Sequence, residues 1–162
     1  AANATINTSD RNEKQDIASL TPTEMLVAAR LSTGFKNFKW KDAVAKKGAA
    51  ARMHSGIIAQ DVQAAFTSEG LDAGDYSMFI SSTWWEHDVD VAAVEADDTV
   101  EPAIEAADAY TRTDTYDTEA EAPEGATSKT RMGIRYPELL AFVAAYNEQR
   151  FASIEARITA LE

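Results

Sequence analysis

The clearest hydrophobic pattern lies at the C-terminal end of the chain. Apolar residues recur there at alternating steps of three and four, which is the heptad spacing of a coiled coil. Isoleucine at both kinds of seam position favours a trimer over a dimer, and Asn147 is the type of polar seam residue that fixes register. We therefore predict a helix over about residues 137–162 with a trimeric seam of Leu140, Ala144, Asn147, Phe151, Ile154, Ile158 and Leu161. An amphipathic helix packed on its own domain is the alternative.

A second helix is predicted nearer the N-terminus, where three start signals coincide. Thr21 can cap the helix, Pro22 occupies a position where a missing N–H costs nothing, and Glu24 can complete a capping box. Apolar residues follow at roughly helical spacing, and Gly34 is a natural end. The predicted helix covers about residues 22–33.

The middle of the chain predicts shorter elements. Residues 35–41 mix aromatic and lysine side chains, which indicates a short strand or hairpin with a basic face. Residues 56–59 form a short buried run, and residues 61–66 give one or two amphipathic helical turns that Gly70 ends. Residues 76–80 are typical of another strand.

Residues 84–130 form an acidic segment rich in alanine and threonine, in which the pattern weakens. Between Glu86 and Glu124 there are 14 acidic residues and one basic residue, Arg112. Residues 110–116 are typical of a solvated strand, and Pro123 with Gly125 marks a turn. We predict a long hairpin or arm that projects from the body.

These elements predict an α+β, mainly helical fold class: a small body with short strands, a projecting acidic arm and the C-terminal coiled-coil helix. We assign residues 9–162 to one domain and residues 1–8 to the end of an upstream protein, because the start of the chain suggests a piece cut from a longer one. The length of 162 residues and the apolar content of 45% suit one domain with a real core.

Composition excludes several functions. The chain has no cysteine, which excludes disulfides, cysteine-ligated zinc and a thiol nucleophile. The formal net charge of -12 repels phosphate, so we predict no nucleic-acid partner and no anionic membrane surface. No run of 18 apolar residues occurs that would span a membrane.

Ser9 and Lys14 are the first candidates for chemistry. A lysine can act as general base for a serine if burial lowers its pKa, because the neutral amine can then accept the hydroxyl proton. Five residues apart in a turn, the two side chains can meet. Taken alone, this spacing is more typical of a solvated polar loop.

Three further residues are candidates: Arg52, His54 and Arg135. Arg52 and His54 precede Gly56 and a buried run, and a structural hydrogen bond from His54 to the backbone is the commoner interpretation of that cluster. Arg135 could orient a carboxylate or carbonyl, and pairing with a surface acid is its commoner interpretation. A metal site in the acidic segment would need the set Glu86, His87, Asp88 and Asp90, whose spacing matches no well-defined ligand pattern. We predict neither a metal nor a cofactor.

Taken in order, the motifs resemble one family: the C-terminal intramolecular chaperone, or auto-processing, domain of phage tailspikes and tail fibres, most like that of an endosialidase tailspike. The resemblance covers the chain from Ser9 onward apart from the acidic segment. It rests on Ser9-Asp10-Arg11 with Lys14 and Ile17, Phe38-Lys39-Trp40-Lys41, Arg52 and His54 with Gly56-Ile57-Ile58-Ala59-Gln60-Asp61-Val62, Gly70-Leu71-Asp72, Gly133-Ile134-Arg135-Tyr136 with Glu138-Leu139-Leu140-Ala141-Phe142, and Ile154-Glu155-Ala156-Arg157.

The resemblance implies a self-cleaving serine endopeptidase that acts once, between Thr8 and Ser9. Ser9 would be the nucleophile and Lys14 its base. The supporting residues would be Asp10, Arg52, His54 and Arg135, through positioning or oxyanion stabilisation.

It also implies a homotrimeric chaperone that aligns three copies of an upstream β-structured tailspike stalk of the same polypeptide. The acidic arm would grip the stalk, and the domain would leave after cleavage, in the host cytoplasm during phage assembly. Prior alignment removes much of the entropic cost of slow, non-local β folding. Two alternatives stay open: a structural trimerisation tip that never cleaves, and a receptor- or glycan-binding fibre tip that uses Trp84, Trp85 and residues 110–116.

Overall fold

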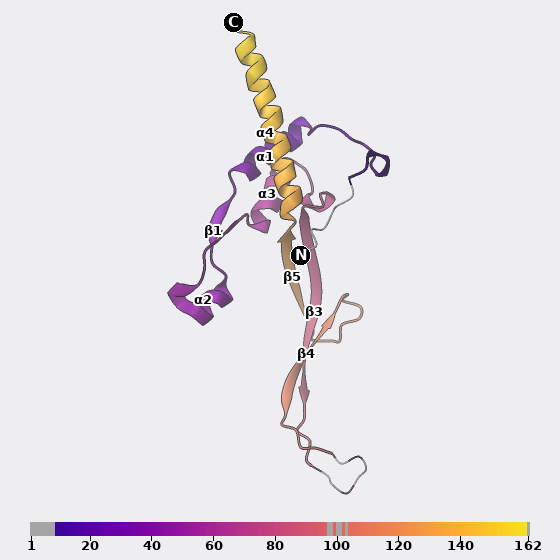
Figure 1. Cartoon of the computed structure of the whole chain (residues 1–162). Helices are drawn as coiled ribbons and strands as arrows, with labels where there is room; N and C mark the ends of the chain where they lie inside the picture. The colour runs from indigo at the N-terminus through magenta and orange to yellow at the C-terminus, as the bar shows by residue number, and fades with distance from the viewer. Residues whose placement is uncertain (1–8, 97–98, 100–101, 103, 162) are drawn as a thin grey trace. The chain divides into compact units, whose positions relative to one another are not determined.

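The computed structural model of the chain describes residues 9–96, 99, 102 and 104–161. It contains two compact units, of which one combines residues 1–73 with residues 136–162 and the other spans residues 74–135. Helices dominate the first unit and strands the second, so the predicted α+β class is confirmed (Figure 1).

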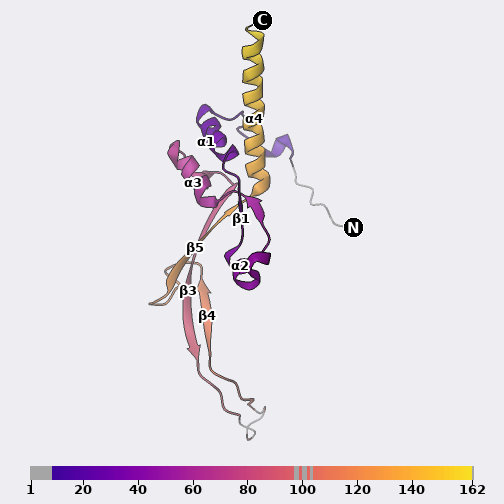
Figure 2. The same cartoon turned by 90° about the vertical axis from the view of Figure 1, so that its left-hand side faces the viewer.

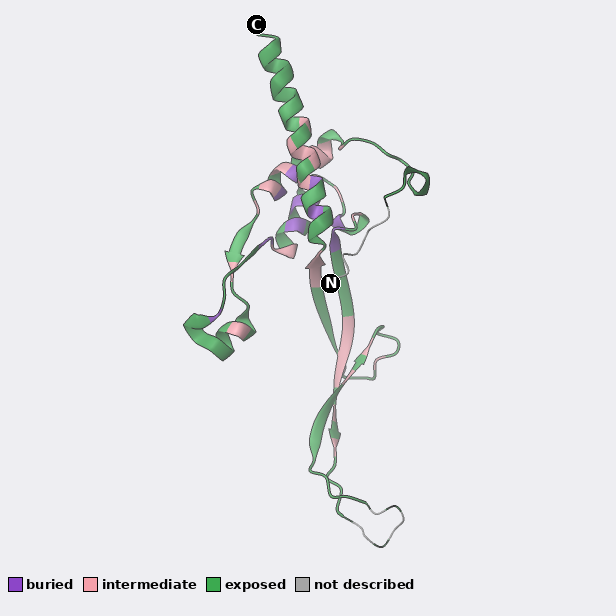
Figure 3. Cartoon of the chain, in the orientation of Figure 1, coloured by how far each residue is buried: buried purple, intermediate pink, exposed green. Residues whose placement is uncertain are grey.

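The helical unit is built around three helices whose contact faces form its core. Helix α1 contributes Val27 and Leu31, helix α3 contributes Phe66, and helix α4 contributes Leu139 and Phe142 (Figure 3). The rings of Phe66 and Phe142 lie 6.1 Å apart. The elements of this unit are η1 (Arg11–Glu13), α1 (Pro22–Ser32), β1 (Lys36–Phe38), α2 (Lys41–Lys47), η2 (Gly48–Ala50), β2 (His54–Gly56), α3 (Ala59–Ser68) and α4 (Tyr136–Thr159).

Helix α1 begins where its sequence signals place it. The Thr21 side chain accepts a hydrogen bond from the Glu24 backbone N–H, and the Glu24 carboxylate accepts one from the Thr21 N–H at 2.7 Å. This reciprocal pair satisfies two backbone donors that the first turn would otherwise leave without partners. The prediction of a capped helix near residues 22–33 is therefore confirmed, with its end one residue earlier than expected.

The short strands β1 and β2 pair antiparallel, with Lys36 opposite Gly56 and Phe38 opposite His54. Tyr136 at the start of α4 packs directly over Gly56, and its hydroxyl oxygen accepts a hydrogen bond from the Ile57 backbone N–H at 3.1 Å. Only a residue without a Cβ leaves room for the phenol at this place. The contact holds the end of β2 to the first turn of α4.

We expect Gly56→Ala to lower the stability of the helical unit by about 1–2 kcal/mol, because the added Cβ displaces the Tyr136 hydroxyl from Ile57. Urea unfolding followed by circular dichroism measures this change. Gly133→Ala is the matched control, since an added Cβ there meets nothing within 4 Å. Equal midpoints for both variants would show that the Tyr136 contact contributes nothing.

The second unit is a three-stranded antiparallel sheet in the order β4-β3-β5. Strand β3 (Phe79–Val91) pairs with β4 (Tyr110–Tyr116) and β5 (Thr127–Ile134), so that Trp85 lies opposite both Tyr116 and Ser128. The prediction of a strand at residues 110–116 is confirmed. The prediction of a strand at residues 76–80 is wrong in extent, because the backbone turns at Tyr76, whose carbonyl accepts from the Phe79 N–H at 3.0 Å.

Helix α4 differs from its prediction at both ends. It begins at Tyr136 and ends at Thr159, so Leu161 lies beyond the helix and is 89% exposed. The proposed seam therefore ends at Ile158 within regular helix. Among the described residues, none of the helices has the length and apolar character needed to cross a bilayer.

Candidate functional site: a serine–lysine pair and an uncovered helix seam

Ser9 and Lys14 meet in the structure. The Lys14 ammonium Nζ donates a hydrogen bond to the Ser9 hydroxyl Oγ at 2.7 Å. The two side chains are brought together by the short helix η1, which reverses the chain between them. A hydroxyl at this distance from an amine can pass its proton to that amine once the amine is neutral.

Asp10 shapes the turn that joins the pair. Its carboxylate accepts a hydrogen bond from the Asn12 backbone N–H at 2.9 Å and so caps η1. At the other end of η1, the Lys14 N–H donates to the Arg11 carbonyl at 3.1 Å. Asp10 therefore acts on the pair through the backbone between Ser9 and Lys14.

The segment around the pair is exposed to solvent. Every residue from Ser9 to Ser19 is exposed, including the apolar side chain of Ile17 at 57%. Thr8, on the other side of the predicted scissile bond, lies outside the described residues. The roles of nucleophile and base stay predictions.

His54 belongs to an aromatic cluster on the β1–β2 ribbon. Its ring stacks on Phe38 at 6.0 Å and meets the edge of Trp40 at 6.2 Å. Phe38 and Trp40 also pack edge to face at 5.3 Å. Trp40 is 57% exposed, so the cluster presents a preformed aromatic surface to solvent.

Within the helical unit, the structure does not bring Arg52 and His54 to Ser9. The β1–β2 ribbon, with Arg52 exposed beside His54, and the helix η1 lie on opposite sides of α4 (Figures 1 and 2). Arg135 belongs to the sheet unit, where its backbone N–H donates to the Met78 carbonyl at 2.8 Å. Of the predicted site residues in the helical unit, Asp10 and Lys14 lie at Ser9.

The predicted seam of α4 is uncovered in the single chain. At about 100° per residue, Leu139 and Phe142 fall on a face beside the seam, and this face packs into the core. The seam side chains themselves point away from it: Leu140 is 51% exposed, Phe151 58% and Ile158 54%, while Asn147 is half-buried. The helix thus has a second apolar face that the described residues of its own chain leave exposed.

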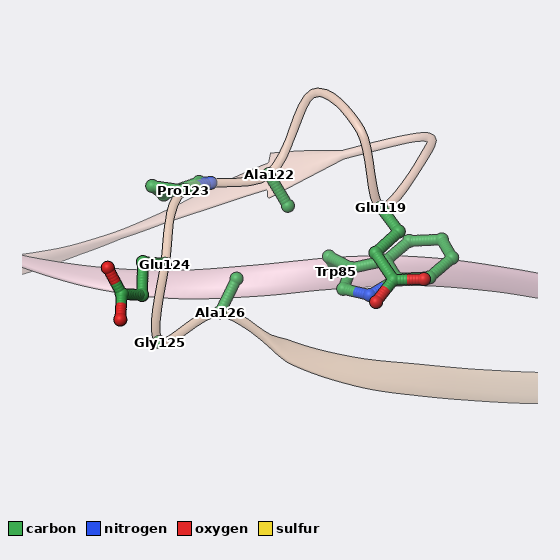
Figure 4. A pocket seen from close by; sticks show the side chains of 7 residues that line it. All are labelled: Trp85, Glu119, Ala122, Pro123, Glu124, Gly125 and Ala126. Atoms are coloured by element: carbon green, nitrogen blue, oxygen red, sulfur yellow. The ribbon is translucent and has the colours of Figure 1, made fainter.

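The acidic segment offers a small pocket but no ligand cluster. Strand alternation turns His87 and Asp88 to opposite faces of the sheet, and no group of three or more histidine or acidic side chains within the described residues could hold a metal ion. A cavity of about 260 Å³ lies between Trp85 and the turn at Pro123, with the Glu119 carboxylate beside the indole (Figure 4). Trp84 lies on the other sheet face, where Arg131 packs over its ring at 5.3 Å.

Sequence reasoning missed the contact between Tyr136 and Ile57. The two residues are 79 positions apart, and no local pattern links a tyrosine before Pro137 to the backbone of a distant loop. The small residue Gly56 was the available signal, because a glycine between a strand and a helix often marks a close approach.

The sequence and the fold are both similar to those of known phage proteins. Residues 9–71 match a family described as the chaperone of endosialidase. A probable tail spike protein of Klebsiella phage 0507-KN2-1 is 31% identical over 96% of this chain, which spans only 12% of that protein. The carboxy-terminal domain of the bacteriophage T5 L-shaped tail fibre, solved with its intramolecular chaperone domain, is 24% identical and superposes on 98% of this chain and 33% of its own with a TM-score of 0.68. A crystal structure of a novel intramolecular chaperone is 26% identical, with a TM-score of 0.54 over 90% of this chain and 99% of its own.

The class of protein follows from these matches and from the fold: an intramolecular chaperone domain of the phage tail fibre and tailspike kind. Residues 9–71 match the family of the endosialidase chaperone, which confirms the resemblance that the motifs predicted.

Proposed function

We propose that the chain is a homotrimeric intramolecular chaperone that releases itself by cutting the bond between Thr8 and Ser9. The observation that carries the proposal is the hydrogen bond of 2.7 Å between Lys14 and Ser9. This contact places the serine hydroxyl beside the amine that would act as its base, which is the arrangement that an activated nucleophile requires.

The proposed reaction is an acyl shift followed by hydrolysis. Ser9 Oγ attacks the Thr8 carbonyl carbon while Lys14 takes the hydroxyl proton, and the C–N bond breaks as that proton passes to the Ser9 nitrogen. The product is an ester between Thr8 and the Ser9 hydroxyl. Water then adds to this ester, freeing the Thr8 carboxylate and leaving Ser9 as the new N-terminus. Attack on an adjacent carbonyl has the advantage of proximity, which lowers the entropic part of the barrier.

The proposed assembly role rests on the uncovered seam of α4. Exposed apolar residues at heptad spacing are stabilised by joining helices of other copies, and isoleucine at both seam positions favours three. A trimer of α4 would bring three upstream stalks into register before they fold. We place this role in the host cytoplasm during phage assembly, with the stalk of the same polypeptide as client.

The acidic segment is proposed to contact the stalk. Its surplus of carboxylates favours polar contacts that form quickly and dissociate readily. The receptor-tip alternative would use the pocket at Trp85 instead, and binding of the isolated chain to host cells would favour it.

Asp10 gives a prediction specific to the proposed cleavage. Asp10→Ala removes a cap worth about 1 kcal/mol, so we expect cleavage to slow by about five-fold. Asp10→Asn keeps an oxygen that can accept from Asn12 and is expected to cleave at nearly the normal rate. The rates are measured by the loss of intact chain on a gel. An Asn variant as slow as the Ala variant would show that the charge of Asp10, not the cap, matters.

A further inference from the structure

The described part of the chain does not supply the cover that the proposed chemistry of the Ser9–Lys14 site needs. A lysine amine in water holds its proton at neutral pH, and removal from water favours the neutral form that acts as a base. Within one chain, every residue from Ser9 to Ser19 is exposed. The apolar side chain of Ile17, on the same segment, is also without cover.

A second uncovered surface lies on the β1–β2 ribbon. We call Phe38, Trp40 and His54 the ribbon face. Their ring centroids lie 5.3 to 6.2 Å apart. Because the rings pack against one another, the shape of this face is set before anything binds. Beside it, Met53 is 60% exposed. An aromatic patch that includes an imidazole can exclude water from a neutral amine and offer that amine a ring N–H as donor.

The positions of the two surfaces suit a head-to-tail contact. The helix α4 lies between η1 and the ribbon (Figures 1 and 2). In a cyclic trimer around α4, one flank of each chain meets the opposite flank of the next chain. The bond between Ile57 and Tyr136 ties the ribbon to α4, so a trimer that fixes α4 also fixes the ribbon.

We propose that the ribbon face of one chain covers the Ser9–Lys14 site of its neighbour, so that the site is complete only between copies. This inference rests on the proposed trimer and cleavage. Ile17 supplies an apolar anchor against the neighbour's ribbon. Trp40 and His54 are positioning residues. They contact the Lys14 amine of the adjacent chain, not that of their own chain, and they exclude water from it.

Mixed trimers test the proposal. One chain carries Ser9→Ala, which removes the nucleophile but keeps a normal ribbon. The other carries Trp40→Ala with His54→Ala, which keeps the nucleophile but damages the ribbon. Each variant alone is expected to stay intact. Refolded together in equal amounts, about half of the ribbon-variant chains should be cleaved, because half of them have a normal ribbon as their neighbour. With nine-fold excess of the Ser9→Ala chain, about nine-tenths should be cleaved.

Intact mass spectrometry reads the result, since the two chains differ in mass. Native mass spectrometry verifies that ribbon variants form trimers, and His54→Gln alone replaces the double variant if they do not. Lys46→Ala, exposed on α2, is the control and should be cleaved without help. If the chain with Trp40→Ala and His54→Ala stayed intact in every mixture while the unaltered chain was cleaved, the proposal that the site is completed by a neighbouring copy would be overturned. This result would leave the proposed cleavage standing. An unaltered chain that is never cleaved would overturn the proposed function as well.

Discussion

A chain carrying Ile154→Glu with Ile158→Glu is expected to be monomeric. Both side chains lie on the exposed seam of α4, and in a trimer each substitution would place three carboxylates around one axis. The loss of apolar burial and the cost of the buried charges together should weaken association on the order of a thousand-fold or more. Sedimentation equilibrium measures the change directly.

The control for the seam introduces the same two glutamates on another side of α4. Ser153→Glu with Ala156→Glu adds the same charges to exposed positions on the opposite side of α4. This variant should stay trimeric. If both double variants were trimeric, the seam would not be the assembly surface, and α4 would be a helix that serves only its own domain.

Replacing Ser9 by alanine is expected to abolish cleavage, and replacing Lys14 by methionine to slow it by about 10²–10⁴-fold, the range that a positioned general base contributes. The two losses differ because the first removes the attacking atom and the second only its proton acceptor. Gel densitometry over time gives both rates. Both variants should still form trimers, because neither residue lies on α4.

Lys36→Met is the matched control for Lys14→Met. Lys36 is also an exposed lysine, and its Nζ pairs with the Asp61 carboxylate at 2.6 Å. Its loss should leave the cleavage rate unchanged. A Lys14→Met chain that is cleaved as fast as this control would remove lysine from the mechanism and leave the serine with another base.

The sequence predicted those elements whose signals are local. The N-cap, the proline and the capping box of helix α1 all lie within four residues. The contact between Ser9 and Lys14 needs only a turn of five residues. The seam of α4 was readable because a heptad repeats along one helix. These features depend on neighbours in the chain, which a single sequence displays.

Other elements were not predicted, because their local signals are weak or because they depend on distant residues. Helix α2 has neither a side-chain cap nor a buried residue, so nothing in residues 41–47 marks its bounds. Strand β3 is rich in polar side chains and owes its length to pairing with β4 and β5, which begin some distance along the chain. The position of the β1–β2 ribbon, which carries His54, on the opposite side of α4 from η1 is likewise a property of the fold, since spacing in the sequence cannot set it.

The most direct test of the account is the intact mass of the freshly made chain, followed over time under native conditions. The account predicts two products, one ending at Thr8 and one beginning at Ser9, formed without any other protein and absent from the Ser9→Ala chain. A stable trimer of full mass would contradict self-cleavage and leave a structural assembly domain.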